Sequence, residues 1–447
     1  MSEARGSAPD APAGGVLRRA LRNAGLLLTG KAAAGLMQLA TFAIAARSLG
    51  LTDFGNLSVM LAGMQLLIVL ATFQSNQAIV RYGVLHLRNG DRQAFQRMIK
   101  LGFLLDLAAA AAAVTVALLL APLIAEGAGW TAQQVEAWRV LSLLPVTIAL
   151  ATPKGMLRLF GRFDLLARHV TVTPLARLAG AVVLALMGAG LMGWVVMWLV
   201  AGIAGLLVVF WFAIREARRR ELLGGMALRL TGLRRGNPGM LRFALLSNMH
   251  SSLIFLPGHV ATFSVGMVLG PQSAGLMKVA QELGSGLAKP IDLINQTVYP
   301  DIARLAAENA WQRVRKLVRK AGTTAAAVSL LVTLVLLLAG RPIIGLIFGA
   351  EFEGAHALLV LISLATSVSV SVFAVDATLY AIGKPSRPLA TAIAANLLFV
   401  GVMFAAFGPL GLLAPGAAWL AAAAVTFTLS LVWMAAVVPR PGEGSAP

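Results

Sequence analysis

The chain has 447 residues, of which 58% are hydrophobic and 12% are charged, and its mean hydropathy is +0.82. Such a large apolar share exceeds that of soluble domains and could not be buried in a soluble fold. The formal net charge is +19, and the chain has no cysteine, which excludes disulfides and thiolate chemistry. Composition therefore predicts an integral membrane protein.

Apolar runs of about 20 residues or more recur along the chain, each long enough to cross a hydrocarbon core roughly 30 Å thick. They predict an all-α membrane protein, in which proline interrupts the fourth, seventh and eighth helices. The first run is too long for a signal-peptide core and no cleavage site follows it, so we expect it to be retained. The twelve predicted helices span approximately residues 24–46, 57–80, 101–125, 140–160, 169–189, 191–214, 243–269, 272–300, 321–347, 356–382, 389–408 and 412–438.

The 37 Lys and Arg residues are distributed unevenly among the connections between these helices. If the connections alternate between two sides, one side holds 30 of them and the other holds only Arg47, Arg139 and Arg341. Basic residues accumulate on the cytoplasmic side, so both termini are predicted to be cytoplasmic. The basic runs 215–223 and 311–320 are interpreted as topology determinants that contact membrane lipids, and not as a nucleic-acid site.

Two short sequence matches indicate an internal duplication. LGLTDFG (49–55) in the first half matches LGPQSAG (269–275) in the second, and FGRF (160–163) matches IGKP (382–385) at nearly the same offset along the chain. Because each half has six helices, an even number, the halves share one orientation and should be related by an axis along the membrane normal. The predicted organisation is two six-helix lobes, 24–214 and 243–438, joined by a basic cytoplasmic linker, 215–242, with cytoplasmic tails 1–23 and 439–447, of which residues 1–15 are expected to be disordered.

The eighth predicted helix is unusual because it carries four charges, at Lys278, Glu282, Lys289 and Asp292. At 100° per residue they share a stripe about 80° wide. Facing lipid, each charge would cost roughly 2.5–3.5 kcal/mol near the midplane, so this stripe is expected to face a cavity between the lobes. The alternative is that Lys278 pairs with Glu282, and Lys289 with Asp292, as packing contacts.

Two further cations, Lys31 and Arg177, each lie about eight residues into a predicted helix, where they either extend to the membrane surface or line the same cavity. Gln38 extends the polar face of the first helix toward its middle. Lys289 is our first choice for a substrate contact and Lys278 our second. No catalytic residue, metal ligand or cofactor is predicted, and the candidate substrate-binding residues are Lys31, Arg177, Lys278, Glu282, Lys289 and Asp292.

Other intramembrane polar residues are given structural interpretations. Asp106 is interpreted as structural, and Asp376 as a partner of Lys384 or a helix-end group. His250 and His259 flank Pro257 and could be protonatable cavity groups, but a satisfied core histidine is the commoner case.

The segment 46–83, which contains ARSLGLTDFGNLS, and the segments 268–287 and 298–305 of the second half resemble bacterial polysaccharide flippases. These proteins are members of the multidrug/oligosaccharidyl-lipid/polysaccharide exporter superfamily. The resemblance implies a location in a bacterial cytoplasmic (inner) membrane, two helical lobes around a central cavity and alternating access. It also implies transfer of an undecaprenyl-pyrophosphate-linked oligosaccharide to the outer leaflet, with a polysaccharide polymerase, chain-length machinery and a coupling ion (H⁺ or Na⁺) as further partners.

A purely structural membrane protein stays open, and so do two rival functions. A membrane polysaccharide polymerase or ligase would need extracytoplasmic residues to hold an acceptor, and the longest outer connection, 126–138, has thirteen. A drug or cation antiporter would favour unpaired carboxylates, whereas four acids within the predicted helices are matched by four bases. No phosphate-binding loop, zinc-protease motif or nucleophile elbow is present, so an enzyme is not predicted. The glycan, whether O-antigen, capsule, exopolysaccharide or peptidoglycan precursor, is not specified.

Overall fold

The structure is a computed structural model that describes the backbone of residues 13–226, 232–233 and 237–437, and the side chains of 30–226, 232–233, 237–244, 256–286, 298 and 301–436. All regular secondary structure in these residues is helical, which confirms the predicted all-α fold. The first half comprises α1 Ala13–Ala71, α2 Ser75–Arg88, α3 Arg92–Ala128, α4 Ala132–Leu141, a 3₁₀ helix Leu144–Leu150, α5 Ala151–Leu159, α6 Phe163–Leu186 and α7 Leu191–Arg219. The second comprises α8 Met240–Leu269, α9 Pro271–Ala307, α10 Trp311–Phe348, a 3₁₀ helix Ala350–Ala355, α11 His356–Val370, α12 Phe373–Ala381, α13 Ser386–Leu410, a 3₁₀ turn Gly411–Leu413 and α14 Ala414–Val437.

The helices follow the twelve predicted membrane passes. By length and hydropathy, eight stretches of the described residues could cross a membrane, and Gly30–Arg88 and Ser386–Ala436 are each long enough for two passes. Helices α8 and α9, whose side chains are only partly described, account for the remaining two. The first helix begins at Ala13, so part of the stretch expected to be disordered is helical, and residues 1–12 lie outside the description.

Three passes are broken helices, and only one of these breaks was expected. Residues 72–74 separate α1 from α2 in the second pass, a 3₁₀ segment around Pro145 separates α4 from α5 in the fourth, and a turn at 371–372 separates α11 from α12 in the tenth. Conversely, Pro257 and Pro290 do not end α8 and α9, because helices in a packed bundle tolerate proline where neighbours satisfy the freed backbone groups.

The two halves repeat the same backbone events, as the sequence matches predicted. Gly50 (φ 70°, ψ 173°) separates the first two passes, and Gly270 (φ 85°, ψ 170°) separates the seventh and eighth. Positive φ disfavours residues with a Cβ, so glycine occupies most such helix ends. The helix ends with positive φ recur at a nearly constant offset, in the pairs Gly50 and Gly270, Gly90 and Asn309, Gly129 and Gly349, Gly161 and Gly383, and Gly188 and Gly411.

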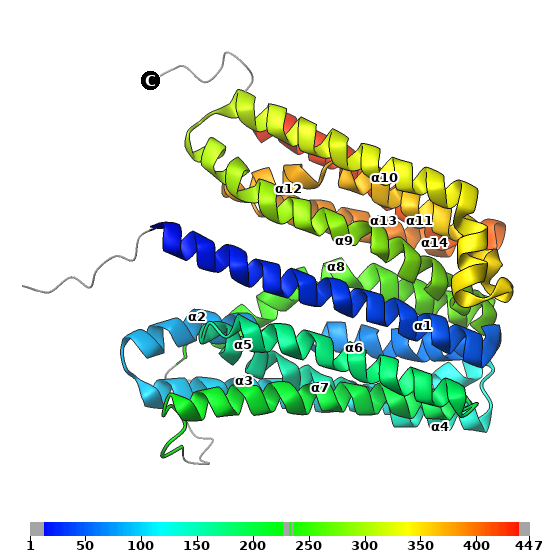
Figure 1. Ribbon diagram of the computed structural model, residues 1–447, viewed down its shortest axis with the longest axis horizontal. Helices are drawn as coiled ribbons and strands as arrows, with labels where there is room; N and C mark the ends of the chain where they lie inside the picture. The colour runs from blue at the N-terminus through cyan, green and yellow to red at the C-terminus, as the bar shows by residue number, and fades with distance from the viewer. Residues whose placement is uncertain (1–12, 227–231, 234–236, 438–447) are drawn as a thin grey trace, which may run out of the picture.

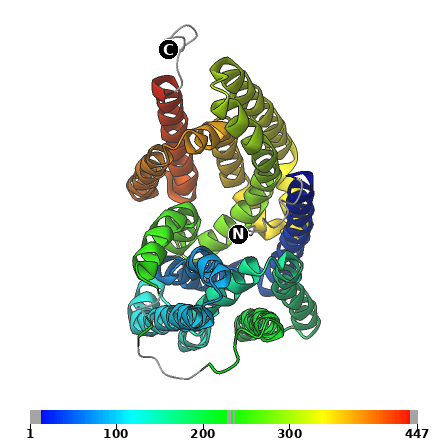
Figure 2. The same cartoon turned by 90° about the vertical axis from the view of Figure 1, so that its left-hand side faces the viewer.

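Helices α1 and α8 lie between the two groups of helices, with α2 to α7 on one side and α9 to α14 on the other (Figures 1 and 2). Helix α1 packs against α8, against α6 and α7 of the first group, and against α9 of the second. The largest apolar core continues through this contact: Phe42 of α1, Trp198 of α7 and Met277 of α9 belong to one buried cluster.

The two halves meet tightly at the end of the molecule where α1 bends. A Cβ on Gly55 would lie 1.8 Å from the carbonyl oxygen of Pro271, so the two backbones touch there. The Arg47 guanidinium donates to the carbonyl oxygens that end α10, those of Ile347 (3.0 Å), Gly345 (3.5 Å) and Leu346. We call this end the closed end.

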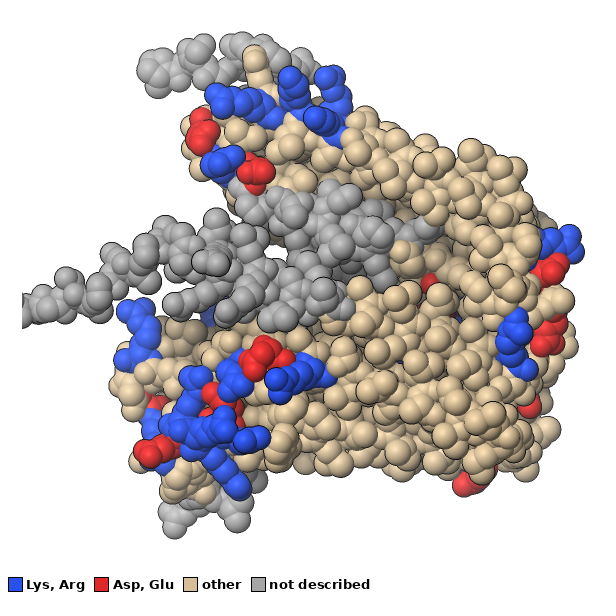
Figure 3. Space-filling view, in the orientation of Figure 1, with Lys and Arg blue, Asp and Glu red and all other residues tan. Residues whose placement is uncertain are grey.

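Reciprocal polar contacts reinforce the closed end. The backbone N–H of Leu51 donates to the Glu351 carboxylate (3.2 Å), and Gln272 Nε2 donates to Thr52 Oγ1 (3.3 Å). Basic side chains gather at the opposite end, where α2 meets α3 and α7 ends, and few are visible at the closed end (Figure 3). The charge asymmetry read from the sequence is therefore an asymmetry between the two ends of the folded molecule.

Candidate functional site

A polar network joins α1 and α9 inside the interface between the halves. Lys278 Nζ lies 2.6 Å from Glu282 Oε1, and their side chains are 19% and 9% exposed. Gln38 of α1 donates through Nε2 to both Glu282 oxygens, at 3.3 and 3.2 Å. Lysine and glutamate four residues apart lie one turn apart on a helix, which explains the ion pair. The Glu282 carboxylate thus links one half of the chain to the other.

Two buried aromatic rings separate Lys278 from the second predicted cation, Arg177. Lys278 Nζ lies 4.4 Å from the centroid of the Phe42 ring, Phe42 packs against Trp198 at 5.2 Å, and the Arg177 guanidinium lies 5.2 Å from the Trp198 ring. A cation over an aromatic face is attracted by the ring quadrupole. Helices α9, α1, α7 and α6 therefore contribute one stack, which we call the aromatic bridge: Lys278, Phe42, Trp198 and Arg177.

The two cations of the aromatic bridge differ in their partners. Lys278 is neutralised by Glu282, whereas the Arg177 Nε is buried and has no hydrogen-bond partner among the described residues. A buried donor without a partner costs about 1–3 kcal/mol, so the fold retains Arg177 at an energetic cost. Arg177 is therefore the cation of this site with hydrogen-bonding capacity left for a ligand.

Helix α8 borders the same region. Gln281 of α9 donates to the carbonyl oxygen of Gly258 (2.8 Å) and accepts from Thr262 Oγ1 (2.8 Å), which ties α9 to α8 just after its internal proline. His259 is partly buried and close enough to Lys278 and Glu282 to interact electrostatically with both. His259 thus lies beside the network, and no hydrogen bond among the described residues places it within the network.

The remaining predicted site residues are not brought together in the described part of the structure. Lys31 is exposed on α1, in keeping with a side chain that extends toward a surface. The side chains of Lys289, Asp292 and His250 lie outside the described residues, so their roles stay predictions. Of the two glycines on α9, Gly284 packs closely, because a Cβ there would lie 2.9 Å from Ile362 Cγ2, whereas a Cβ on Gly286 would meet nothing.

Two acidic residues lie away from the aromatic bridge. Asp376 is in the first turn of α12, so its interpretation as a helix-end group fits, and no ion pair with Lys384 is present among the described residues. Asp106 is fully buried in α3, where it accepts hydrogen bonds from Ser75 Oγ (2.6 Å) and from the Thr152 backbone N–H (2.8 Å). Within the described residues, no three His, Asp or Glu side chains come together as a metal site would require.

Sequence reasoning missed the two aromatic residues of the site. Phe42 and Trp198 lie in uniformly apolar runs, where helical periodicity does not distinguish a ring facing the other half from one facing lipid. The signal that was available is the spacing of Gln38 and Phe42, which are four residues apart and therefore on the same face of α1.

Similarity to known proteins identifies the family of the chain. The family described as "Polysaccharide biosynthesis protein" matches residues 20–306. The inner membrane protein YghQ of Escherichia coli strain K12 is 30% identical over 347 residues, which cover 78% of this chain and 97% of that protein. The inner-membrane relative and the apolar helices together support a multi-pass inner membrane protein.

Solved structures show the fold. An inward-facing multidrug resistance MATE family transporter of the MOP superfamily superposes with a TM-score of 0.72 at 16% identity, covering 92% of this chain and 96% of that one. An outward-facing structure of a transporter with the same description gives 0.60 at 16% identity, with coverages of 94% and 95%. A MOP superfamily transporter from Pyrococcus furiosus also gives 0.60 at 16% identity, with the same coverages. The chain thus has the fold of two six-helix lobes.

Proposed function

Because the chain belongs to the polysaccharide biosynthesis protein family, within the multidrug/oligosaccharidyl-lipid/polysaccharide (MOP) superfamily of membrane transporters, we propose that it is a lipid-linked oligosaccharide flippase. Its substrate would be an undecaprenyl-pyrophosphate-linked repeat unit, moved across the cytoplasmic membrane for O-antigen, capsule or exopolysaccharide synthesis. A polymerase and chain-length machinery would act on the translocated unit.

The observation that carries this proposal is Arg177, whose buried Nε has no hydrogen-bond partner among the described residues and which the aromatic bridge connects to Lys278 of the second lobe. Guanidinium groups bind phosphate oxygens through two parallel hydrogen bonds, so Arg177 suits the diphosphate of the lipid carrier. Lys278 is already neutralised by Glu282, which makes Arg177 the better contact among the described cations. Lys289, our first choice from sequence, stays a second proposal for the same role.

The orientation of the molecule is part of the proposal. Basic residues gather at the end opposite the closed end, so that end faces the cytoplasm by the positive-inside rule. The contacts of Arg47 and Glu351 then close the lobes on the outer side. We propose that this is the inward-facing state of an alternating-access cycle, and that both termini are cytoplasmic.

The alternative of a drug or cation antiporter is favoured by one observation, the Glu282 carboxylate at the lobe interface. Its pairing with Lys278 opposes that role, since a cation would have to displace the lysine. A polymerase or ligase is less well supported, because α3 continues to Ala128 and α4 begins at Ala132, which shortens the expected outer connection.

The test compares Arg177→Gln and Arg177→Lys in a strain that lacks the chromosomal gene, with export of surface polysaccharide as the readout. Losing a charge-assisted contact to the diphosphate should cost about 1.5–3 kcal/mol, so Arg177→Gln should reduce export roughly 10- to 100-fold at matched protein abundance. Arg177→Lys, which keeps the charge but not the paired geometry, should fall between Arg177→Gln and the wild type. Lipid-linked repeat units should accumulate on the cytoplasmic leaflet.

Arg139→Gln is the matched control, because Arg139 is an exposed arginine that pairs only with Glu136 in the described structure, at 3.5 Å. It should export normally. Full export by Arg177→Gln would remove Arg177 from the site, and absence of the lipid-linked unit in the deletion strain would point to an earlier biosynthetic step. Increased drug sensitivity with normal polysaccharide would favour the antiporter.

A further inference from the structure

Asp106 is a carboxyl group in the interior of the first lobe that the proposed transport site does not use. It lies in the first half of α3, a few residues into the predicted third pass, and has no exposed surface. Burying an ionised carboxylate without a cation costs several kcal/mol, and such groups are usually paired or neutralised. No basic side chain pairs with Asp106 in the described part of the chain.

The charged and titratable groups on the elements packed against α3 form no ion pair or hydrogen bond with Asp106 among the described residues. Arg81 of α2 stacks on Phe243, and Glu136 and Arg139 of α4 pair with each other. Lys154 and Arg158 of α5 and His259 of α8 make no ion pair with Asp106 in the described structure. The 3₁₀ segment Leu144–Leu150 and residues 54–71 of α1 have no charged side chain. Helix α8 carries an exposed Arg242 at its start, and its His250 side chain is outside the description; Lys100 lies almost two turns before Asp106 on α3 itself.

Asp106 lies where two broken passes meet. Ser75, whose hydroxyl donates to Oδ1, is the first residue of α2 after the break in the second pass. Thr152, whose N–H donates to Oδ2, is in the first turn of α5 after the break in the fourth. In membrane transporters, broken helices place backbone dipoles and side-chain oxygens at ion and proton sites.

Further polar atoms are buried at the same junction. Thr152 is fully buried, and its Oγ1 faces Gly102, one turn before Asp106, where a Cβ would lie only 2.7 Å away. Asn76 Oδ1 is buried without a hydrogen-bond partner among the described residues, and the Asn76 backbone packs against Gly155 of α5. An ionised carboxylate can only accept hydrogen bonds, whereas a protonated one has an O–H to donate.

The second lobe shows that the fold does not require this carboxyl group. At the offset that relates LGLTDFG to LGPQSAG, Gly322 corresponds to Gly102 and Ala326 corresponds to Asp106. Gly322 packs on the break before α12, because a Cβ there would overlap the carbonyl oxygen of Ser371. The same architecture thus forms without an acid at this position.

We propose that Asp106 is a proton-binding site of the first lobe. The ionised form holds the starts of α2 and α5 through charge-assisted hydrogen bonds from Ser75 and Thr152, and the protonated form, which has lost the charge, holds them less strongly. Gain or loss of the proton therefore changes how the second and fourth passes are tied together. Coupling of this proton to substrate movement rests on the proposed function; proton binding does not.

The test uses the full-length protein in nanodiscs and infrared difference spectroscopy across a pH series. A protonated carboxyl gives a C=O band distinct from that of a carboxylate, and we expect one such band to disappear in Asp106→Asn. Asp376→Asn, which removes another intramembrane carboxyl, is the matched control and should keep that band. Ser75→Ala retains the acid but removes a donor to it, so the band should persist and move to higher frequency.

An unchanged spectrum in Asp106→Asn would overturn the proposal. It would also be overturned if the intensity of the band changed with added NaCl but not with choline chloride, because sodium would then be the ligand of the carboxyl group. If Asp106→Asn does not fold, a band in Ser75→Ala identical to that of the wild type would also overturn it. Because none of these measurements uses a transported substrate, their failure is distinguishable from failure of the proposed flippase activity.

Discussion

Lys278 and Glu282 show how one ion pair can serve two purposes. Their pairing allows two charges to lie inside an apolar helix bundle, and the Gln38 contacts to Glu282 connect the pair to the other half of the molecule. Removing one member leaves the other charge buried and uncompensated, whereas removing both leaves neutral groups of similar shape.

A double-mutant cycle tests this balance. Lys278→Gln and Glu282→Gln should each destabilise the protein by roughly 2–5 kcal/mol, and the double variant should recover much of that loss. Thermal unfolding in detergent measures the stability of the three variants and the wild type. Additive losses in the double variant would mean that the two side chains act independently and that the pair is not the stabilising unit.

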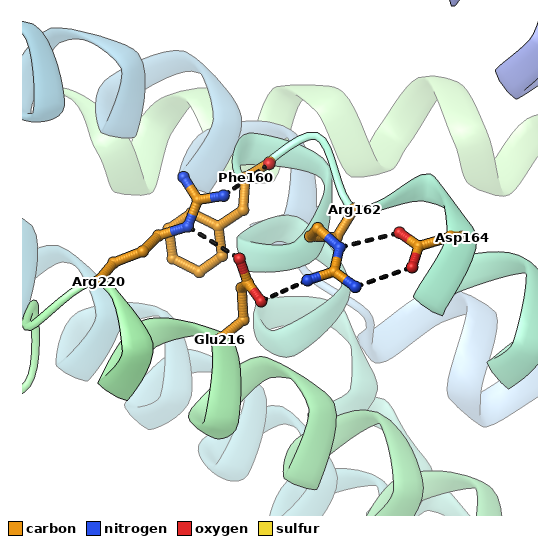
Figure 4. Close-up of polar contacts among 5 residues, drawn as sticks. All are labelled: Phe160, Arg162, Asp164, Glu216 and Arg220. Carbon is orange, nitrogen blue, oxygen red and sulfur yellow. Dashed lines mark hydrogen bonds and ion pairs between the residues drawn. The ribbon is translucent and has the colours of Figure 1, made fainter.

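Four charged residues form a second network at the basic end of the first lobe (Figure 4). Glu216 of α7 accepts from Arg162 (2.6 Å) and from Arg220 (3.0 Å), and Arg162 also forms a paired contact with Asp164 (2.9 and 2.8 Å). Arg220 donates to the carbonyl oxygen of Phe160 (3.1 Å) and lies over its ring. The network fastens the end of α5 and the start of α6 to the end of α7.

This network predicts an acid-sensitive contribution to stability. The hydrogen bond from Arg162, followed by the charge of that arginine, lowers the pKa of Asp164 below its ordinary value. The stabilisation is therefore complete above the ordinary aspartate pKa of about 4 and is lost as the pH falls through the lowered one. Asp164→Asn should remove this part of the pH dependence of thermal unfolding, by less than about 1 kcal/mol because the pair is partly exposed. If thermal unfolding of Asp164→Asn depended on acidic pH in the same way as that of the wild type, this prediction would be contradicted.

At the scale of helices, close backbone contact decides where the halves touch. Gly55 of α1 meets Pro271 of α9, and Gly275 of α9 meets Leu51 of α1, where a Cβ would lie 3.0 Å from the carbonyl oxygen. The two sequence matches LGLTDFG and LGPQSAG thus pack against each other across the closed end. Small residues allow such approach between membrane helices.

Gly55→Ala should therefore force the closed end apart. The added methyl would overlap a backbone carbonyl, so we expect a loss of roughly 1–3 kcal/mol and greater labelling of a cysteine at Gln272 by a water-soluble maleimide. Gly401→Ala is the control: its Cβ meets nothing within 4 Å, and alanine in a helix should be neutral or stabilising by up to about 1 kcal/mol. Equal effects of the two substitutions would contradict the packing argument.

At the scale of the whole molecule, the polar contacts between the lobes divide into two sets. The contacts of Arg47, Leu51 and Thr52 lie at the closed end, and those of Gln38 lie inside the interface. An alternating-access cycle requires the closed end to separate, so each contact at that end must break once per cycle.

A cysteine crosslink tests that separation. The chain has no cysteine, so Thr52→Cys with Gln272→Cys introduces a single pair, at side chains whose polar atoms are 3.3 Å apart. Oxidation should link the lobes and reduce export to background, and a reductant should restore it. Each single variant with the same oxidant is the control. Full export by the crosslinked protein would mean that the lobes do not part at this end.

Sequence alone determined the class of the protein, because few backbone structures satisfy their own hydrogen bonds inside the hydrocarbon core of a membrane. Long apolar runs must be helices, their number follows from their length, and the Lys and Arg distribution separates two ends. The duplication was also readable, since LGLTDFG and FGRF of the first half recur as LGPQSAG and IGKP at a nearly fixed offset, and the segments 46–83, 268–287 and 298–305 carry the family resemblance. The pairing of Lys278 with Glu282 was one of two local alternatives that helix geometry allowed.

Tertiary structure decided which charges meet. Sequence placed Lys278 and Arg177 on different helices, and only the packing of α1 between the lobes sets Phe42 and Trp198 between them. The breaks at 72–74 and 371–372 were equally unreadable, because no proline marks them, and at the first of them the partner is the distant Asp106. Local sequence specifies what each helix is made of, whereas the neighbours of a side chain depend on contacts between residues far apart in the chain.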